Sequence, residues 1–326
     1  MKFDCVVLNP PYSESVGGGK GGATETYTSF IEEAIKLSKE FVVPIIPAKW
    51  YVNARGSNVE NFRKKFLTCK KIKEMHDYSN EKDVFPNIDL RGGVCYFLYS
   101  KSYNLSLCNH VLDGVSYKRE LNNRYNIFIR DINLERLVNS LHSDSSFTNI
   151  VSVTAPFGFL TDVFDNFDKY ELPEMSNVQD ELNCCRVFGS FKRVMYCSKE
   201  YPIPRLDSSF DKYKIFIAWA DSCMDFKKLN LKPFIGKPFD MCTETYLTIG
   251  SFDTLEEAES CISYISTKFF HALVSAKKVN QHMSRDVYSL IPIVPFDRIW
   301  TDDELFRLFS IDSDLQSYIN LNFHIN

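Results

Sequence analysis

The sequence predicts an α/β fold in which half of a doubly wound sheet is followed by a separate α+β domain. Up to residue 99, short apolar runs alternate with segments of helical period, in the order strand, helix, strand, helix and then a pair of strands. From Leu105 onward, short apolar runs are mixed with polar loops rich in Asn, Asp and Ser. We therefore expect a sheet domain in residues 1–105, an α+β domain in residues 106–295 and a helical tail in residues 296–326.

The composition fits a soluble globular protein of the cytoplasm. The chain has 326 residues, of which 44% are hydrophobic, and its formal net charge is −4. No apolar run approaches the roughly 18 residues of a membrane span, and no N-terminal signal peptide is recognisable. The ten cysteines show no C-x-x-C spacing. This pattern favours reduced, buried thiols, so we expect no metal site.

The first element is expected to be a buried strand at residues 3–8, because this run is short, apolar and contains β-branched residues. It leads directly into the tetrapeptide Asn9-Pro10-Pro11-Tyr12. Loops at the carboxyl ends of strands carry the ligand sites of open α/β sheets. The tetrapeptide is therefore the first candidate site.

The glycine-rich stretch at residues 17–22 contains the spacing G-x-G-x-x-G. A nucleotide-binding motif of this form has to open a helix directly after a strand, and here Pro10 and Pro11 intervene. We interpret the stretch as a loop that closes over the substrate.

The next elements follow from apolar periodicity. Phe30, Ala34 and Leu37 recur at helical spacing. Pro44 interrupts the following apolar run and predicts an irregular or edge strand. The expected elements are a helix at residues 26–39, a strand at 41–47, a helix at 58–66, a strand at 71–78 and a strand at 92–99 that follows a turn.

The tetrapeptide resembles the catalytic motif of amino-methyltransferases, above all the DNA adenine-N6 enzymes. In that family an Asn side-chain oxygen and the carbonyl of the first Pro accept hydrogen bonds from the target amine, which helps to localise its lone pair. The resemblance assigns these parts to Asn9 and Pro10. Pro11 stiffens the turn, and Tyr12 stacks on a base flipped out of the duplex.

Two further strings, Ile46-Pro47-Ala48-Lys49-Trp50 and residues 83–94, resemble the gamma-like Eco57I-type restriction-modification methylases. The resemblance implies that residues 1–105 form the second half of a Rossmann-like, S-adenosylmethionine (SAM)-dependent methyltransferase sheet. It also implies a second aromatic on the other face of the base pocket, for which Phe85 is the candidate. The region downstream would then be a target-recognition domain that reads double-stranded DNA in the major groove.

Candidate DNA-binding residues follow from this resemblance. A segment at residues 262–271 looks helical and contains Ile265-Ser266-Thr267, and a basic stretch follows it. The same region of the family carries a comparable helix and a basic, Gln-containing segment. The DNA-binding candidates are Lys49, Lys277, Lys278, Gln281 and Arg285. Farther along, Thr301 and Glu304 form a capping box that predicts a helix start.

The resemblance implies SAM as the methyl donor, although no SAM-binding loop is recognisable in the sequence. In the usual gamma order that loop and an acidic residue precede the catalytic tetrapeptide, and here two residues precede Phe3. The strand at residues 3–8 would be central in a complete sheet, so without its neighbours it becomes an exposed apolar edge. We expect a SAM-binding partner subunit, the rest of a longer enzyme, another copy of the chain or rearranged segments to cover it.

The leading hypothesis is the catalytic and DNA-recognition portion of a site-specific DNA adenine-N6 methyltransferase from a restriction-modification system. An alternative is a non-catalytic DNA-binding specificity module that keeps the tetrapeptide as a structural turn. A third reading is an N-methyltransferase that acts on cytosine N4, RNA or a protein Gln.

Overall fold

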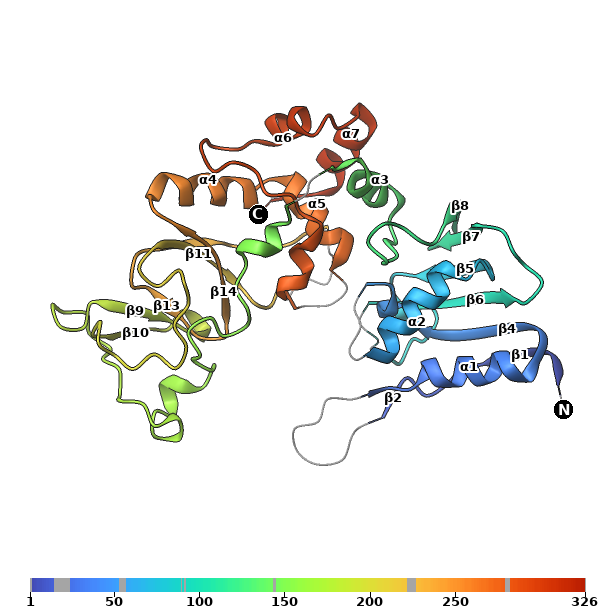
Figure 1. Cartoon of the computed structure of the whole chain (residues 1–326), viewed down its shortest axis with the longest axis horizontal. Helices are drawn as coiled ribbons and strands as arrows, with labels where there is room; N and C mark the ends of the chain where they lie inside the picture. The colour runs from blue at the N-terminus through green and yellow to red at the C-terminus, as the bar shows by residue number, and fades with distance from the viewer. Residues whose placement is uncertain are drawn as a thin grey trace. The chain divides into compact units, whose positions relative to one another are not determined.

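The computed structural model describes residues 2–14, 24–52, 57–88, 90, 92–142, 145–221, 227–278 and 282–325. The chain divides into two compact units, Met1–Arg130 and Asp131–Asn326 (Figure 1), which are described separately below. Among the described residues, no helix is long and apolar enough to cross a membrane, and no group of three or more His, Cys, Asp or Glu side chains is placed to hold a metal ion.

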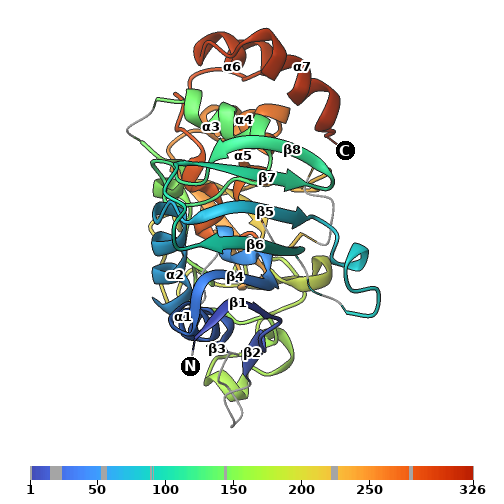
Figure 2. The ribbon, with the colours of Figure 1, turned by 90° about the vertical axis from the view of Figure 1, so that its right-hand side faces the viewer.

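The first unit is built on a six-stranded sheet with the strand order β1-β4-β6-β5-β7-β8 (Figure 2). The β1–β4 and β5–β7 pairs are parallel, whereas β6 is antiparallel to both β4 and β5. β1, β4, β5 and β7 therefore run in one direction. The strands are β1 (Phe3–Leu8), β4 (Ser38–Pro47), β5 (Ile72–Tyr78), β6 (Val94–Ser100), β7 (Leu107–Leu112) and β8 (Val115–Glu120).

Two helices, α1 (Tyr27–Leu37) and α2 (Ser57–Thr68), connect the parallel strands and lie on the same side of the sheet (Figure 2). The core between α2 and the sheet is aromatic. Trp50 packs edge-on against Phe62, which stacks on Phe66 at a centroid distance of 4.1 Å. Trp50 also donates its Nε1 hydrogen to Cys95 Sγ at 3.4 Å. These contacts anchor the segment after β4 to the sheet, which fixes the position of the residues discussed below.

The mixed α/β class predicted for this region is confirmed, and one detail differs. Of the two positions predicted for Pro44, irregular or edge, the structure has the irregular one: Pro44 lies in an interior strand, and the β4–β6 register omits residues 43 and 44. A proline has no N–H to donate, so the irregularity is absorbed by a gap in the ladder. The detail that differs is the end of the compact unit, which lies at Arg130 and not at residue 105, because β7 and β8 continue the same sheet.

The second unit contains two three-stranded sheets, with the orders β10-β9-β13 and β12-β11-β14, and helices, one of which packs on the second sheet. The strands are β9 (Cys185–Phe188), β10 (Val194–Cys197), β11 (Tyr213–Ala218), β12 (Phe234–Gly236), β13 (Met241–Cys242) and β14 (Tyr246–Phe252). The helices are α3 (Ile132–Ser140), α4 (Leu255–Ile265), α5 (Lys268–Lys277), α6 (Asp302–Leu308) and α7 (Ser313–Asn322). This arrangement is an α+β unit.

The helix predicted at residues 262–271 is in fact the junction of two helices. α4 ends at Ile265, and Thr267 caps α5 by accepting a hydrogen bond from the Phe270 N–H at 3.1 Å. A threonine hydroxyl in this position satisfies one of the free amides of a helix start, which favours the break. The capping box predicted at Thr301 and Glu304 is confirmed at the start of α6.

His271 on α5 makes the stability of the second unit depend on pH. The side chain is buried, and burial lowers its pKa to about 4, although the charge of Asp221 acts in the opposite direction. The unfolded chain, with a histidine pKa of about 6.5, therefore binds more protons than the folded chain between pH 4 and 6.5. The contribution of His271 to the free energy of unfolding is fully present above pH 6.5 and is lost as the pH falls toward 4.

We expect the free energy of unfolding to fall by about 2–3 kcal/mol over this interval because of His271 alone. Urea denaturation at successive pH values of the wild type and of His271→Gln measures this contribution as the difference between the two pH slopes. His142→Asn is the matched control, because His142 is exposed. Equal slopes for His271→Gln and the wild type would contradict the expectation.

Candidate acceptor site at the carboxyl edge of the sheet

The tetrapeptide Asn9–Tyr12 lies directly after β1, at the carboxyl edge of the parallel strands. The 3-10 helix η1 (Ala48–Tyr51) follows β4 at the same edge. Segments that follow neighbouring parallel strands meet at one edge of a sheet. The structure therefore brings the tetrapeptide close to the segment that carries Lys49 and Trp50.

The backbone of the turn is held by Thr26, the residue that immediately precedes α1. Thr26 donates its hydroxyl hydrogen to the Pro11 carbonyl at 2.9 Å and its N–H to the Tyr12 carbonyl at 3.3 Å. Short strands β2 (Ser13–Glu14) and β3 (Thr24–Glu25) pair just beyond it. The predicted glycine-rich loop at residues 17–22 lies outside the described residues. The turn is thus fixed at both ends.

The side chains of the tetrapeptide differ in exposure. Asn9 and Pro11 are exposed, Pro10 is buried and Tyr12 is half-buried. Among the described residues, no hydrogen bond engages the Asn9 side chain or the Pro10 carbonyl. Burial, followed by the charge of Cys95, raises the pKa of Tyr12. The two oxygens that the sequence marks as acceptors therefore have no hydrogen-bond donor among the described residues.

Lys49, one of the predicted DNA-binding residues, forms an ion pair with Glu25 at 2.7 Å. The lysine is partly exposed, whereas Glu25 is buried, and its Oε2 atom has no partner among the described atoms. A buried carboxylate is stabilised by a paired cation. Lys49 therefore neutralises a buried carboxylate near the turn. Its contact with DNA stays a prediction.

Phe85 is half-buried in the connection from β5 to β6, where its N–H donates to the Glu81 carbonyl at 2.8 Å. The connection begins at the carboxyl end of β5, which is the edge that carries Asn9–Tyr12. The strand order β1-β4-β6-β5 places the two segments three strand spacings apart, about 14 Å. The stacking role of Phe85 stays a prediction.

The predicted basic stretch of the second unit is less exposed than the sequence suggests. Lys277 is 8% exposed, and its Nζ atom lies 2.7 Å from both Asp286 Oδ1 and Ser289 Oγ. Lys278 is 2% exposed, with Nζ 4.0 Å from Asp221 Oδ2. Their ammonium groups therefore serve the interior of the unit, which argues against the predicted DNA contacts. Arg285 is exposed and donates from Nε to the Thr148 carbonyl at 3.0 Å. Gln281 lies outside the described residues.

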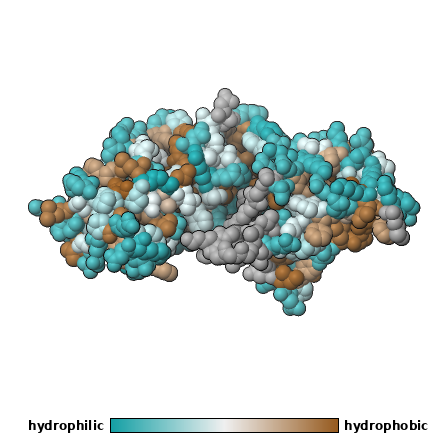
Figure 3. Space-filling view, turned by 60° about the horizontal axis from the view of Figure 1, so that its bottom comes forward, coloured by the Kyte–Doolittle hydropathy of each residue, from teal (hydrophilic) through white to brown (hydrophobic). Residues whose placement is uncertain are grey.

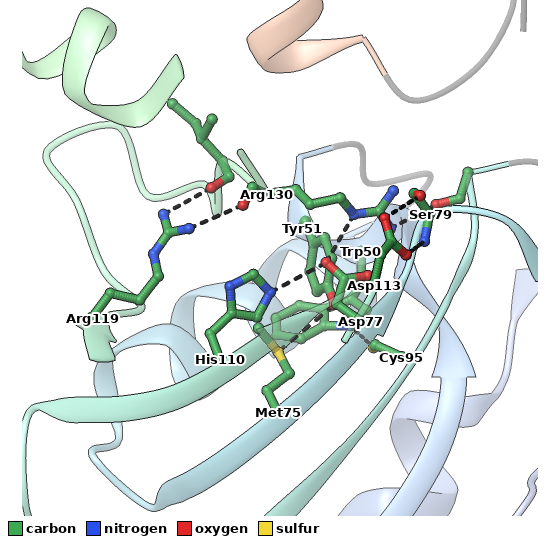
Figure 4. Close-up of polar contacts among 12 residues, drawn as sticks. Trp50, Tyr51, Met75, Asp77, Ser79, Cys95, His110, Asp113, Arg119 and Arg130 are labelled. Carbon is green, nitrogen blue, oxygen red and sulfur yellow. Dashed lines mark hydrogen bonds and ion pairs between the residues drawn. The ribbon is translucent and has the colours of Figure 1, made fainter. Parts of the chain in front are cut away.

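A buried polar cluster at the end of β5 has no counterpart in the sequence-based predictions (Figure 4). Asp77 Oδ2 lies 2.8 Å from Arg130 Nε and 3.4 Å from His110 Nε2. Burial is the largest single influence on the pKa of Arg130 and lowers it, but Asp77, Tyr51 and Cys95 together raise the pKa above its ordinary value. Arg130 also donates to the Gly92 carbonyl at 2.9 Å. The cluster ties the end of the first unit to the middle of its sheet.

The described residues do not fit a SAM site. A SAM-binding loop of the family type follows a strand and contains closely spaced glycines, because the backbone must approach the ligand. β1 is followed by Asn9-Pro10, β4 by Ala48-Lys49, β5 by Ser79-Asn80, and β7 by the hairpin turn Asp113-Gly114. None of these segments provides such a loop. No chemical step is therefore assigned to SAM-binding residues within the described ranges.

The first unit is similar to known methylases. Residues 1–85, about a quarter of the chain, match the family of Eco57I restriction-modification methylases. A curated protein of Mycoplasma pneumoniae (strain ATCC 29342 / M129), described as an uncharacterized adenine-specific methylase, is 39% identical over 105 residues. This match covers 32% of the chain and 25% of the relative. The chain thus accounts for about a quarter of the relative's length.

Solved structures of restriction-modification proteins show a distant likeness. The type IIG restriction endonuclease BpuSI has a TM-score of 0.38 at 13% identity, over 97% of this chain and 49% of its own. The type IIL enzyme MmeI in complex with DNA has a TM-score of 0.40 at 10% identity, over 81% and 39%. A type I methyltransferase subunit from Streptococcus thermophilus has a TM-score of 0.28 at 16% identity, over 43% and 31%.

These structural likenesses are too weak to assign a function to the chain. The family match is more specific, because it covers the tetrapeptide Asn9–Tyr12 and the segment around Lys49. The resemblance to the Eco57I-type restriction-modification methylases is thus confirmed, and it extends over residues 1–85 of the chain.

Proposed function

We propose that the chain is the catalytic and DNA-recognition portion of a site-specific DNA adenine-N6 methyltransferase. Its first unit would hold the target base at the carboxyl edge of the sheet, and its second unit would read double-stranded DNA. The SAM-binding half would come from residues outside the described ranges or from a partner. The observation that carries the proposal is that neither the Asn9 amide nor the Pro10 carbonyl has a hydrogen-bond partner among the described residues, on a turn fixed by Thr26.

In this proposal Asn9 Oδ1 and the Pro10 carbonyl oxygen accept the two hydrogens of the exocyclic amine of the target adenine. Such preorganised dipoles stabilise positive charge as it develops on the nitrogen. Tyr12 supplies one face of the pocket by stacking on the flipped base, and Phe85 is proposed for the other. SAM supplies the methyl group when the donor half is present. The roles of the chain's own residues are to hold and orient the acceptor.

The edge strand β1 supports the proposal of a further polypeptide segment or subunit. Val7 is 75% exposed, and Phe3, Cys5 and Phe41 are exposed beside it. Hydrophobic side chains gather on this part of the surface, toward the right of Figure 3. An unpaired apolar edge strand is a template for further strand pairing. We propose that the donor half pairs with β1.

A substitution on this edge tests the pairing. Val7→Lys is expected to change the free energy of unfolding by less than about 0.5 kcal/mol, because the side chain is exposed. It should nevertheless weaken association with the donor half and reduce methyl transfer. Val115→Lys is the matched control, because Val115 is 54% exposed and lies on β8, at the opposite edge of the sheet. Equal effects of the two substitutions would contradict the pairing at β1.

A non-catalytic DNA-binding specificity module is the second candidate, and it is favoured by the lack of a SAM-compatible loop in the described residues. Methyl transfer, DNA binding and SAM binding together distinguish the two candidates. The chain is assayed for transfer of a labelled methyl group from SAM to plasmid DNA, alone and together with the product of the coding sequence that flanks it. Transfer in the second assay supports the enzyme. DNA binding without transfer, and without calorimetric binding of SAM in any combination, supports the module.

A further inference from the structure

The tip of the β9–β10 hairpin in the second unit presents one aromatic side chain to solvent. Phe191 is 96% exposed. The turn is Ser190–Arg193, and it is closed by the Arg193 N–H, which donates to the Ser190 carbonyl at 3.0 Å. A phenylalanine ring exposed to this degree makes almost no contact within its own chain. The stability of the folded unit therefore does not explain why a phenylalanine occupies this position.

The backbone at this tip is strained. Phe191 has φ 54° and ψ 30°, and Lys192 has φ 60°. Left-handed conformations at both central residues are the pattern of a type I′ turn, which Asn and Gly adopt readily and bulky residues do not. The β7–β8 hairpin uses Asp113-Gly114 for the same purpose, with φ 47° and 88°. The chain therefore uses favourable residues in one hairpin and unfavourable ones in the other.

The base of the tip is rigid. The ring of Phe164 packs on Gly189, where an added Cβ would lie 2.3 Å from Phe164 Cε2. The guanidinium of Arg193 lies 5.4 Å above the same ring and donates from Nη1 to both carboxylate oxygens of Asp165, at 2.8 and 2.9 Å. These contacts hold the hairpin from both strands but leave the ring of Phe191 free. A rigid arm loses little conformational freedom when it binds.

We propose that Phe191 is a wedge that inserts between two base pairs of duplex DNA. An apolar ring on a rigid support is the kind of side chain that DNA-binding proteins use to separate stacked bases. Lys192, exposed beside it, adds positive charge facing the phosphate backbone. Strain that persists at an exposed tip points to a functional constraint. This inference rests on the proposed function, since it takes duplex DNA as the ligand of the second unit.

Binding to two duplexes that differ only in one abasic site tests the wedge without knowledge of the recognition sequence. An abasic site lowers the cost of unstacking, so a protein with a wedge prefers this duplex. In fluorescence anisotropy titrations, Phe191→Ala should lose this preference and weaken the binding of the abasic duplex by roughly tenfold. Phe191→Trp, which keeps an aromatic ring, should retain both. Leu182→Ala is the matched control, because Leu182 is 79% exposed in the same unit.

A second variant distinguishes the effect of losing the aromatic ring from the effect of changing the backbone strain of the turn. Phe191→Asn removes the ring but suits the left-handed backbone, so its melting temperature should equal or exceed that of the wild type while the preference for the abasic duplex is lost. If the wild type binds both duplexes and Phe191→Ala binds each of them as tightly as the wild type does, the wedge is wrong and the proposed function stands. If the wild type binds neither duplex, DNA binding itself is contradicted, and the wedge with it.

Discussion

Asn9→Ala is expected to reduce the rate of methyl transfer to DNA by about 10²–10³-fold, the cost of removing one preorganised hydrogen-bonding group from a reaction centre. The expectation follows from the amide of Asn9, which has no hydrogen-bond partner in the described part of the chain, on a turn that Thr26 holds in place. Single-turnover transfer of labelled methyl groups to plasmid DNA, with the donor half present, measures the rate.

The free energy of unfolding shows whether Asn9→Ala acts on the reaction or on the fold. Asn9 is exposed, so Asn9→Ala should leave the free energy of unfolding within about 0.5 kcal/mol of the wild type. Asn9→Asp keeps an acceptor oxygen at the same position and should retain more activity than Asn9→Ala. Methyl transfer by Asn9→Ala at the wild-type rate would show that Asn9 does not bind the acceptor amine.

Asp77→Asn is expected to destabilise the first unit by about 3 kcal/mol, which is typical when one partner of a buried ion pair is removed. Asp77 is fully buried and faces Arg130 Nε at 2.8 Å. Without the carboxylate, the positive charge of the mostly buried guanidinium has no counterion at this position. Urea denaturation at neutral pH measures the loss.

Asp162→Asn is the matched control for Asp77→Asn, because Asp162 pairs with Lys169 at 2.7 Å on the surface of the second unit. Exposed pairs contribute little, about 0–1 kcal/mol. A loss at Asp77 no larger than the loss at Asp162 would show that the cluster in Figure 4 does not anchor the end of the first unit.

The elements of the first unit up to β6 could be predicted from the sequence because their apolar periodicity is strong. α1, β4, α2, β5 and β6 lie within a few residues of the predicted ranges. The sequence does not predict the β7–β8 hairpin, although Asp113-Gly114 is a favourable hairpin turn. Polar residues in both strands obscure their alternation, so the sequence predicts a boundary at residue 105, whereas the compact unit ends at Arg130.

The side-chain partners of the second unit were harder to predict. Lysines are ordinarily exposed, so the basic stretch at Lys277 and Lys278 suggested a DNA-binding surface. α5 is buried on most sides, however, and both lysines meet carboxylates brought in from other segments, Asp286 and Asp221. The Asp77–Arg130 pair likewise joins residues 53 positions apart. Contacts of this kind depend on the tertiary fold, and local sequence patterns do not predict them.

The proposed acceptor site holds the amine of a target adenine, and the methylated product tests this directly. Plasmid DNA from cells that express the chain with its flanking coding sequence is digested to nucleosides and examined by mass spectrometry. N6-methyladenine is expected with the wild type, and its loss is expected with Asn9→Ala. N4-methylcytosine as the product, or equal amounts of N6-methyladenine with both proteins, would contradict the proposed acceptor site.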